Sequence, residues 1–208
     1  MWLASAYRRG RPTFQFAGQT YSYLHHWYNV TWLHERRVEI PIVRAVLERE
    51  RDVRLLEIGN VLSHYDRTLV HPVVDLYQRP NRENAFAEDA ETFTQGAPYD
   101  LIVSISTFEH IGHDDRPRDE DKIRRTAQHV RGLLSPHGSL AFTAPIGYSP
   151  SLDELVDEGD GFLERRCLRR INAQNEWVEA DWSEVRETRF HHPYPFANAI
   201  VVARVSPR

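Results

Sequence analysis

The stretch from residue 54 to residue 77 constrains the fold of this 208-residue chain more than any other. An apolar run that carries one acid, Glu57, ends at Gly59, and a second apolar run ends at Asp75. Doubly wound α/β domains begin a nucleotide site with this order of elements: a strand, a glycine turn, a short crossover, a second strand and an acid. The turn here holds one glycine where a dinucleotide fingerprint holds three. We therefore expect a nucleotide-type fold with an altered loop.

Composition and charge are those of a globular protein. Hydrophobic residues make up 41% of the chain and charged residues 27%, which is enough apolar material for a core. The net charge of −4 argues against a nucleic-acid or anionic-membrane surface. Of the 26 basic residues, Lys122 is lysine and the other 25 are arginine. We interpret this bias as codon usage of a GC-rich genome rather than as arginine clusters that bind phosphate.

The cysteine content and the hydropathy pattern exclude further classes. Cys167 is the single cysteine, so the chain has neither an internal disulfide nor a multi-cysteine zinc site. No apolar run approaches the roughly 18 residues of a membrane span. The first apolar residues are too few for a secretory signal. We therefore expect a cytoplasmic protein with no membrane partner; the sequence does not indicate an oligomeric state.

Three patterns precede the core domain. Residues 13–23 alternate aromatic and polar side chains around a glycine, which predicts a hairpin. Residues 25–32 are dense in aromatic side chains and are expected either to cover the site as a lid or to plug the end of a sheet. Apolar residues at helical spacing predict a helix over residues 38–47, with Pro41 in its first turn or at a kink.

Alternating strands and helices predict one α/β domain over residues 53–208, preceded by a hairpin, aromatic lid and helix over residues 1–52. The run at 99–106 is nearly continuous in apolar residues, as buried parallel strands are. One apolar face predicts a helix over residues 121–134. Strands are predicted at 53–58, 70–76, 84–87, 99–106, 139–144, 162–171, 176–180 and 199–205.

In their order and spacing these motifs resemble those of class I S-adenosylmethionine (SAM)-dependent methyltransferases. Glu57, Ile58 and Gly59 are similar to the acid-x-Gly start of the family's first motif. The other matches, which extend to about residue 145, are Asp75 after the second strand, Asp89 after the third, the fourth strand at 99–104, the EHI run at 109–111 and the start of the fifth strand at 133–140.

The resemblance implies a Rossmann-like fold: a mostly parallel seven-stranded sheet with an antiparallel last strand and helices on both faces. It implies SAM as the cofactor, lying across the carboxyl ends of the strands. Asp75 would hold the ribose hydroxyls, Leu76 would lie against the adenine, and Asp89 would accept from the adenine amino group. The implied cofactor residues are Glu57, Gly59, Asn60, Asp75, Leu76 and Asp89.

The chain also resembles a subgroup met among enzymes of glycan and natural-product biosynthesis. In that subgroup EIGNVLSHY replaces the multi-glycine turn, and a YN-x-TW-x-x-ER-x-VEIP stretch precedes the domain; here these are residues 57–65 and 28–41. We therefore expect a small-molecule or saccharide substrate. Aromatic faces and amides suit such ligands, so Tyr28, Asn29 and Trp32 are candidate substrate residues.

Methyl transfer to a hydroxyl requires a general base. His110 is the leading candidate because neutral imidazole can accept a proton near pH 7, and Glu109 is the second. Both residues could instead form a helix cap or a packing pair. In another alternative, His110, His113, Asp114 and Asp115 would bind a divalent metal; we expect no metal.

The one-glycine turn decides between the functional hypotheses. Asn60 is the residue expected to supply a left-handed conformation beside Gly59, and Val61 and Leu62 are expected to begin a helix. Glu57, a charge in an apolar strand, would order the loop, meet the cofactor's methionine end or form an internal salt bridge.

The leading hypothesis is an O-directed, SAM-dependent methyltransferase. The first alternative is a methyltransferase-fold protein that has lost catalysis and serves as a binding or partner subunit. The second is an NAD-linked oxidoreductase, which the missing glycines disfavour because a pyrophosphate needs close approach of the backbone.

Overall fold

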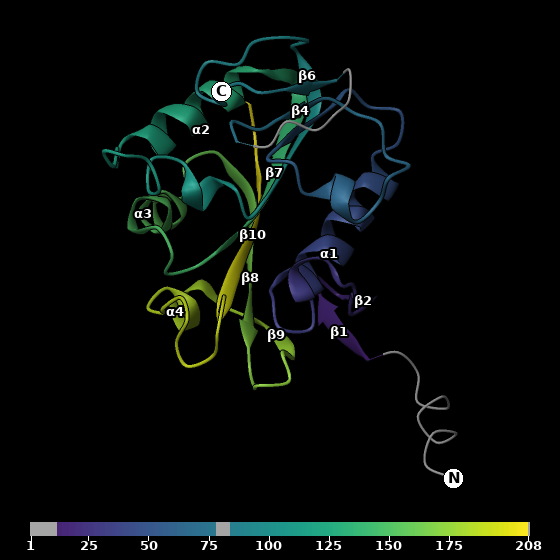
Figure 1. Ribbon diagram of the computed structural model, residues 1–208, viewed down its shortest axis with the longest axis vertical. Helices are drawn as coiled ribbons and strands as arrows, with labels where there is room; N and C mark the ends of the chain where they lie inside the picture. The colour runs from purple at the N-terminus through teal and green to yellow at the C-terminus, as the bar shows by residue number, and fades with distance from the viewer. Residues whose placement is uncertain (1–11, 78–83, 208) are drawn as a thin grey trace.

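The structure is a computed structural model that describes residues 12–77 and 84–207; the expectations for residues 1–11 lie outside this range. One sheet of eight strands forms the centre of the molecule (Figure 1). Its strands are β3 (Leu55–Ile58), β4 (Val73–Val74), β5 (Ala85–Phe86), β6 (Tyr99–Ile105), β7 (Leu134–Pro145), β8 (Phe162–Arg170), β9 (Trp177–Ala180) and β10 (Ala199–Val205).

The spatial order is β5-β4-β3-β6-β7-β10-β8-β9. The first five strands in this order are parallel, and β10 lies antiparallel between β7 and β8. The expected parallel sheet with a reversed last strand is thus confirmed, but the described sheet has eight strands because β9 pairs with the outer edge of β8. The chain order reverses between β3 and β6, so their carboxyl ends form a topological switch point.

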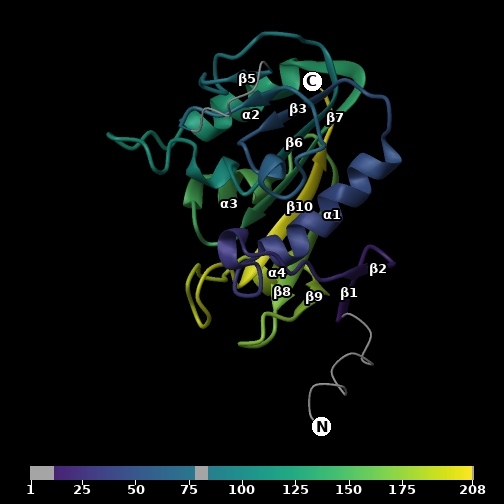
Figure 2. The ribbon, with the colours of Figure 1, turned by 45° about the vertical axis from the view of Figure 1, so that its right-hand side comes forward.

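Helices cover both faces of the sheet, as expected. The helix α1 (Arg36–Arg49) lies on one side of the sheet in both views, and α2 (Lys122–Gly132) and α3 (Pro150–Glu158) lie on the other (Figures 1 and 2). Side chains of β6 alternate between these layers. Leu101 packs with Ile40 of α1, whereas Ile102 belongs to the cluster that contains Ile123 and Leu152, in addition to other residues.

Pro41 lies inside α1 rather than in its first turn. Proline has no N–H, so it cannot donate to the carbonyl of Arg37 four residues earlier. The main-chain N–H of Leu24 donates to that carbonyl instead, at 3.0 Å. This bond ties the helix to the chain that follows the predicted hairpin, which is confirmed as β1 (Thr13–Phe16) and β2 (Gln19–Ser22).

Two local expectations are wrong. No α-helix follows the turn after β3; a single 3₁₀ turn, Leu62–His64, takes its place. The second strand shortens to Val73–Val74 because the preceding residues, including the exposed Val70, do not pair. Within residues 12–77 and 84–207, no helix is long and apolar enough to cross a membrane.

Candidate functional site

A cavity of about 280 Å³ lies at the carboxyl ends of β3, β4 and β6, where ligands bind in open α/β sheets. It brings together most of the residues that the sequence singled out. Those in its lining are Tyr28, Asn29, Gly59, Asn60, Asp75, Leu76, Asp89 and His110. Glu57, Glu109 and Trp32 are not among the lining residues.

Gly59 makes the turn after β3 possible. Its φ of +84° lies in a region that residues with a side chain adopt only with strain. A Cβ atom at this position would overlap the side chain of Thr107 at the end of β6. Asn60, expected to take a left-handed conformation, does not have a positive φ. One glycine is enough because the chain needs only one such residue here.

Glu57 holds the turn from beneath the cavity. It is fully buried, and its Oε1 accepts from the main-chain N–H groups of Val61, at 2.9 Å, and Leu62, at 2.7 Å. Its Oε2 lies 2.7 Å from Nε2 of His71. These partners satisfy a carboxylate that would otherwise be expensive to bury. Glu57 therefore orders the loop and forms an internal pair, and its expected contact with the cofactor is not supported.

Asp75 links the two strand ends. Its Oδ2 accepts from the N–H of Asn60 at 2.8 Å, and its Oδ1 accepts from the N–H of Tyr77 at 2.9 Å. A carboxylate can accept about four hydrogen bonds in all. Leu76, half-exposed, lies next to it on the cavity wall.

Asp89 is the acid of an ion-pair bridge that the sequence did not reveal. Its Oδ1 accepts from the N–H of Glu91, and its Oδ2 lies 2.8 Å from Nζ of Lys122. The same Nζ lies 2.8 Å from Oδ2 of Asp115. Burial alone would raise the pKa of Asp89, but Lys122 and the Glu91 amide outweigh it and lower that pKa. The side chains of Asp89, Asp115 and Lys122 all belong to the cavity lining.

His110 lies at the edge of the cavity with its side chain 46% exposed. Its Nδ1 is 2.6 Å from Oδ2 of Asp114, to which the Tyr148 hydroxyl also donates at 3.0 Å. Burial would raise the pKa of Asp114, yet these two hydrogen bonds outweigh it and lower the pKa. A carboxylate at Nδ1 favours the tautomer that carries its proton there and leaves Nε2, which lies 3.6 Å from Oε1 of Glu109, as an acceptor.

The metal alternative for these loop residues is not supported. Among residues 12–77 and 84–207, no three His, Cys, Asp or Glu side chains lie close enough together to hold a metal ion. Instead, Asp114 pairs with His110, and Asp115 pairs with Lys122. The loop carboxylates are therefore partners of neighbouring protein cations and imidazoles.

Glu109 lies outside the cavity lining, next to His110, and its expected role as a base stays a prediction. It is only 2% exposed, and its Oε2 has no hydrogen-bond partner. Burial holds the pKa of Glu109 well above its ordinary value, although the nearby Arg36 favours the carboxylate. Arg36 itself lines the cavity, pairs with Glu39 and donates to the carbonyl of Ser106 at 3.3 Å. Arg36 and Glu39 belong to the sequence motif at residues 28–41, but neither was expected to be a site residue.

The aromatic segment forms one wall of the cavity. The ring of Tyr28 stacks on that of His64, with centroids 4.1 Å apart and planes 9° apart. Asn29 and Val30 have φ values of 54° and 46°, and this conformation is strained for a β-branched residue. Trp32 stacks on His25 outside the cavity lining, so its expected substrate contact is not supported.

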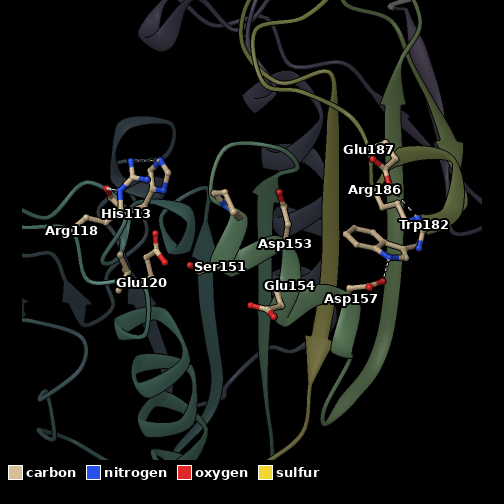
Figure 3. A pocket seen from close by; sticks show the side chains of 12 residues that line it. His113, Arg118, Glu120, Ser151, Asp153, Glu154, Asp157, Trp182, Arg186 and Glu187 are labelled. Carbon is tan, nitrogen blue, oxygen red and sulfur yellow. Dashed lines mark hydrogen bonds and ion pairs between the residues drawn. The ribbon is translucent and has the colours of Figure 1, made fainter.

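A larger hollow of about 530 Å³ lies between α3, the loop before α2, and α4 (Trp182–Val185). Figure 3 shows Asp153 and Glu154 of α3 in its middle, flanked by His113 and Arg118 on one side and Trp182 on the other. Burial raises the pKa of Asp153 to about 7. None of the residues expected to bind the cofactor or the substrate, or to act as the base, lines this hollow, so the smaller cavity is the candidate site.

Comparison with known proteins supports the fold. No protein-family model matches the sequence, and no curated protein matches it. Among solved structures, the chain is similar to N-methyltransferase NodS from Bradyrhizobium japonicum WM9 in complex with S-adenosyl-L-homocysteine. The sequences are 17% identical, the match covers 84% of this chain and 88% of that chain, and the TM-score is 0.54.

A second similar structure is a TehB-like SAM-dependent methyltransferase from Corynebacterium glutamicum, which is 16% identical. That match covers 82% of this chain and 87% of the other, with a TM-score of 0.50. At such identities the likeness concerns the fold alone. The Rossmann-like methyltransferase fold expected from the sequence is confirmed.

Proposed function

We propose that the protein is a SAM-dependent methyltransferase that transfers a methyl group to a hydroxyl of a small molecule or sugar. The observation that carries this proposal is the convergence of Gly59, Asp75, Asp89 and His110 on one cavity at the switch point of a methyltransferase fold. These residues come from four separate segments. The resemblance to enzymes of glycan and natural-product biosynthesis supports the choice of acceptor.

The residues around the cavity fit SAM. Asp75 would accept from the ribose hydroxyls, since one carboxylate can serve two donors. Leu76 would lie against the adenine, and Asp89 would accept from its amino group. The turn at Gly59 and Asn60, which lines the cavity, would face the methionine end.

SAM supplies a methyl group on a sulfonium, so the protein's tasks are to orient the acceptor and to manage its proton. His110 takes the proton of the acceptor hydroxyl at Nε2. Asp114 holds the Nδ1 side and favours the positive charge that develops on the imidazole, as a carboxylate does in a catalytic triad. Glu109 is not assigned a proton-transfer role because it does not line the cavity.

A wider groove adjoins the cavity. This groove, about 1290 Å³, shares Leu76, Tyr77, His110, Asp115 and Lys122 with the cavity. Tyr28 and Asn29 lie on the cavity wall and offer an aromatic face and an amide to a ring-shaped substrate. Tyr28 and Asn29 are therefore the proposed substrate contacts, and Trp32 is not one of them.

The alternative of a non-catalytic partner subunit requires that the cofactor space be filled. Leu62 packs in the core between α1 and the sheet rather than in the cavity, and Val61 and His64 contribute to its walls. The cavity, about 280 Å³, is therefore not filled by these side chains, which favours the catalytic proposal. Isothermal titration of the purified protein with SAM and S-adenosylhomocysteine, with NAD⁺ as the comparison ligand, tests it. Heat with the first two ligands supports the proposal, and no heat at millimolar concentration, or heat with NAD⁺ alone, rejects it.

A further inference from the structure

Lys122 is the one lysine in a sequence with 26 basic residues, and it lies on the wall of the cavity. It begins α2, and its side chain is 12% exposed. Its Nζ is 2.8 Å from Oδ2 of Asp89 and 2.8 Å from Oδ2 of Asp115. Lys122 therefore bridges two segments of the cavity wall. Burial would lower the pKa of Lys122, but the two carboxylates outweigh it and raise the pKa. The side chain is therefore a fixed ammonium ion.

The choice of lysine at this position has a geometric reason. Elsewhere on α2 the chain uses arginine for ion pairs, as in Arg124 with Glu158 and Arg125 with Glu91. A guanidinium is a broad planar fork, whereas an ammonium is a compact point charge with three N–H donors. Two of these donors serve Asp89 and Asp115. The compact group leaves room in the cavity beside the bridge, which the guanidinium would fill.

The surroundings of this bridge match one edge of a purine. Leu76, Ala90 and Ile111 supply apolar lining to the same cavity. Adenine carries an amino donor beside a ring-nitrogen acceptor on each of its two polar edges. Asp89 and Lys122 present the complementary pair, a carboxylate acceptor beside an ammonium donor, 2.8 Å apart.

We propose that Lys122 donates a hydrogen bond to the ring nitrogen next to the amino group of the cofactor's adenine, while Asp89 accepts from that amino group. Lys122 is then a specificity-determining residue for an adenine nucleoside, and Asp115 holds it in place. This inference rests on the proposed function, because it assigns the adenine end of the SAM site.

The test removes the acceptor from the ligand as well as the donor from the protein. Calorimetry measures the dissociation constants of S-adenosylhomocysteine and of its 1-deaza and 7-deaza analogues, in which CH replaces one ring nitrogen. The proteins are the unmodified chain, Lys122→Met, Lys122→Arg, and the control Arg124→Met, which alters an exposed ion pair on the same helix. The unmodified chain should bind one of the two analogues about 10- to 100-fold more weakly than the parent ligand, as expected for a lost charge-assisted hydrogen bond.

Lys122→Met should bind the parent ligand weakly and lose this discrimination, and Arg124→Met should keep both. Lys122→Arg keeps the charge but should also bind weakly, because the larger group occupies the adenine space. If the unmodified chain binds both analogues as well as the parent ligand, or Lys122→Met discriminates as before, the inference is wrong while the proposed function stands. If the unmodified chain does not bind S-adenosylhomocysteine, both are wrong.

Discussion

Oδ2 of Asp75 accepts a hydrogen bond from the main-chain N–H of Asn60 at 2.8 Å. The acid that ends β4 therefore fixes the turn that ends β3. In this chain no α-helix follows the turn, so side-chain carboxylates hold its N–H groups: Asp75 at Asn60, and Glu57 at the next two residues. One hydrogen bond thus connects the ribose end of the proposed site, at Asp75, with its methionine end, at Asn60.

Asp75→Ala should weaken the binding of S-adenosylhomocysteine by at least about tenfold, because it removes a charged acceptor and loosens the turn. Calorimetry measures the effect, and circular dichroism checks the fold. Asp100→Ala is the control, since Asp100 also accepts two hydrogen bonds, from Arg54 and Ser135, but does not line the cavity. An unchanged dissociation constant in Asp75→Ala would remove this residue from the site.

Gly59→Ala should destabilise the protein by about 1–3 kcal/mol or more, because alanine at a φ of +84° is strained and its Cβ would overlap Thr107. Gly132→Ala is the matched control. Gly132 lies in α2 with open space where a Cβ would be, so alanine there should stabilise by about 0.4–1 kcal/mol. Urea unfolding compares the two, and equal effects would contradict the described turn.

His110→Ala should reduce turnover by about 10²-fold or more once an acceptor is known, with little change in cofactor affinity. His113→Ala is the control because this imidazole, three residues later, lines the hollow of Figure 3 and not the cavity. Steady-state kinetics and calorimetry separate the two effects. Normal turnover of His110→Ala would exclude His110 as the base and would leave Glu109, or orientation alone, as the explanation.

Asp114→Asn tests the positioning of that imidazole. An amide group that donates to Nδ1 would place the ring proton on Nε2, where it cannot accept from the substrate. Turnover should fall at least about tenfold, and Tyr148→Phe, which removes a hydroxyl that donates to Asp114 and lies 3.1 Å from Nδ1 of His110, should have a smaller effect. An Asp114→Asn enzyme with full turnover would contradict the assigned tautomer.

Burial and the adjacent Glu39 raise the pKa of Glu35 from 4.5 to about 7, although Arg36 opposes them. The folded state therefore binds more protons at this carboxyl than the unfolded state does. Its contribution to stability is fully present below about pH 4.5 and is lost as the pH rises through about 7. Burial lowers the pKa of the neighbouring His34 from 6.5 to about 3, so this imidazole has the opposite effect, and its contribution to stability grows as the pH rises from about 3 to about 6.5.

Glu35→Gln removes this titrating carboxyl. The loss of unfolding free energy between about pH 4.5 and 7 should therefore be about 1–3 kcal/mol smaller in Glu35→Gln than in the unmodified chain. Urea titrations at several pH values measure the difference. The amide oxygen of glutamine still accepts from the N–H of Ala197, which keeps that contact constant. Identical pH profiles for the two proteins would exclude Glu35 as the titrating group.

The fold was accessible from the sequence because its signals are local. Continuous apolar runs mark buried parallel strands, as at Tyr99–Ile105, and the capping box at Asp181 and Glu184 marks the start of α4. The length of β4 depends on pairing with its neighbours, which local patterns do not contain.

The site was accessible only in part. Glu109 and His110 are adjacent in the sequence but have opposite environments, since the 3₁₀ turn Phe108–His110 points consecutive side chains about 120° apart. The sequence gives no sign of which one faces the cavity. Lys122 reaches the site from a separate helix, and its one signal was its rarity among arginines.

The central claim is that SAM binds in the cavity at Asp75, and a crystal structure of the protein with S-adenosylhomocysteine tests it most directly. We predict the ligand across the ends of β3 and β4, with its ribose hydroxyls at hydrogen-bond distance, about 2.5–3.2 Å, from the carboxylate of Asp75. A cavity that remains empty at millimolar ligand, or a ligand seated in the hollow of Figure 3, would contradict the account.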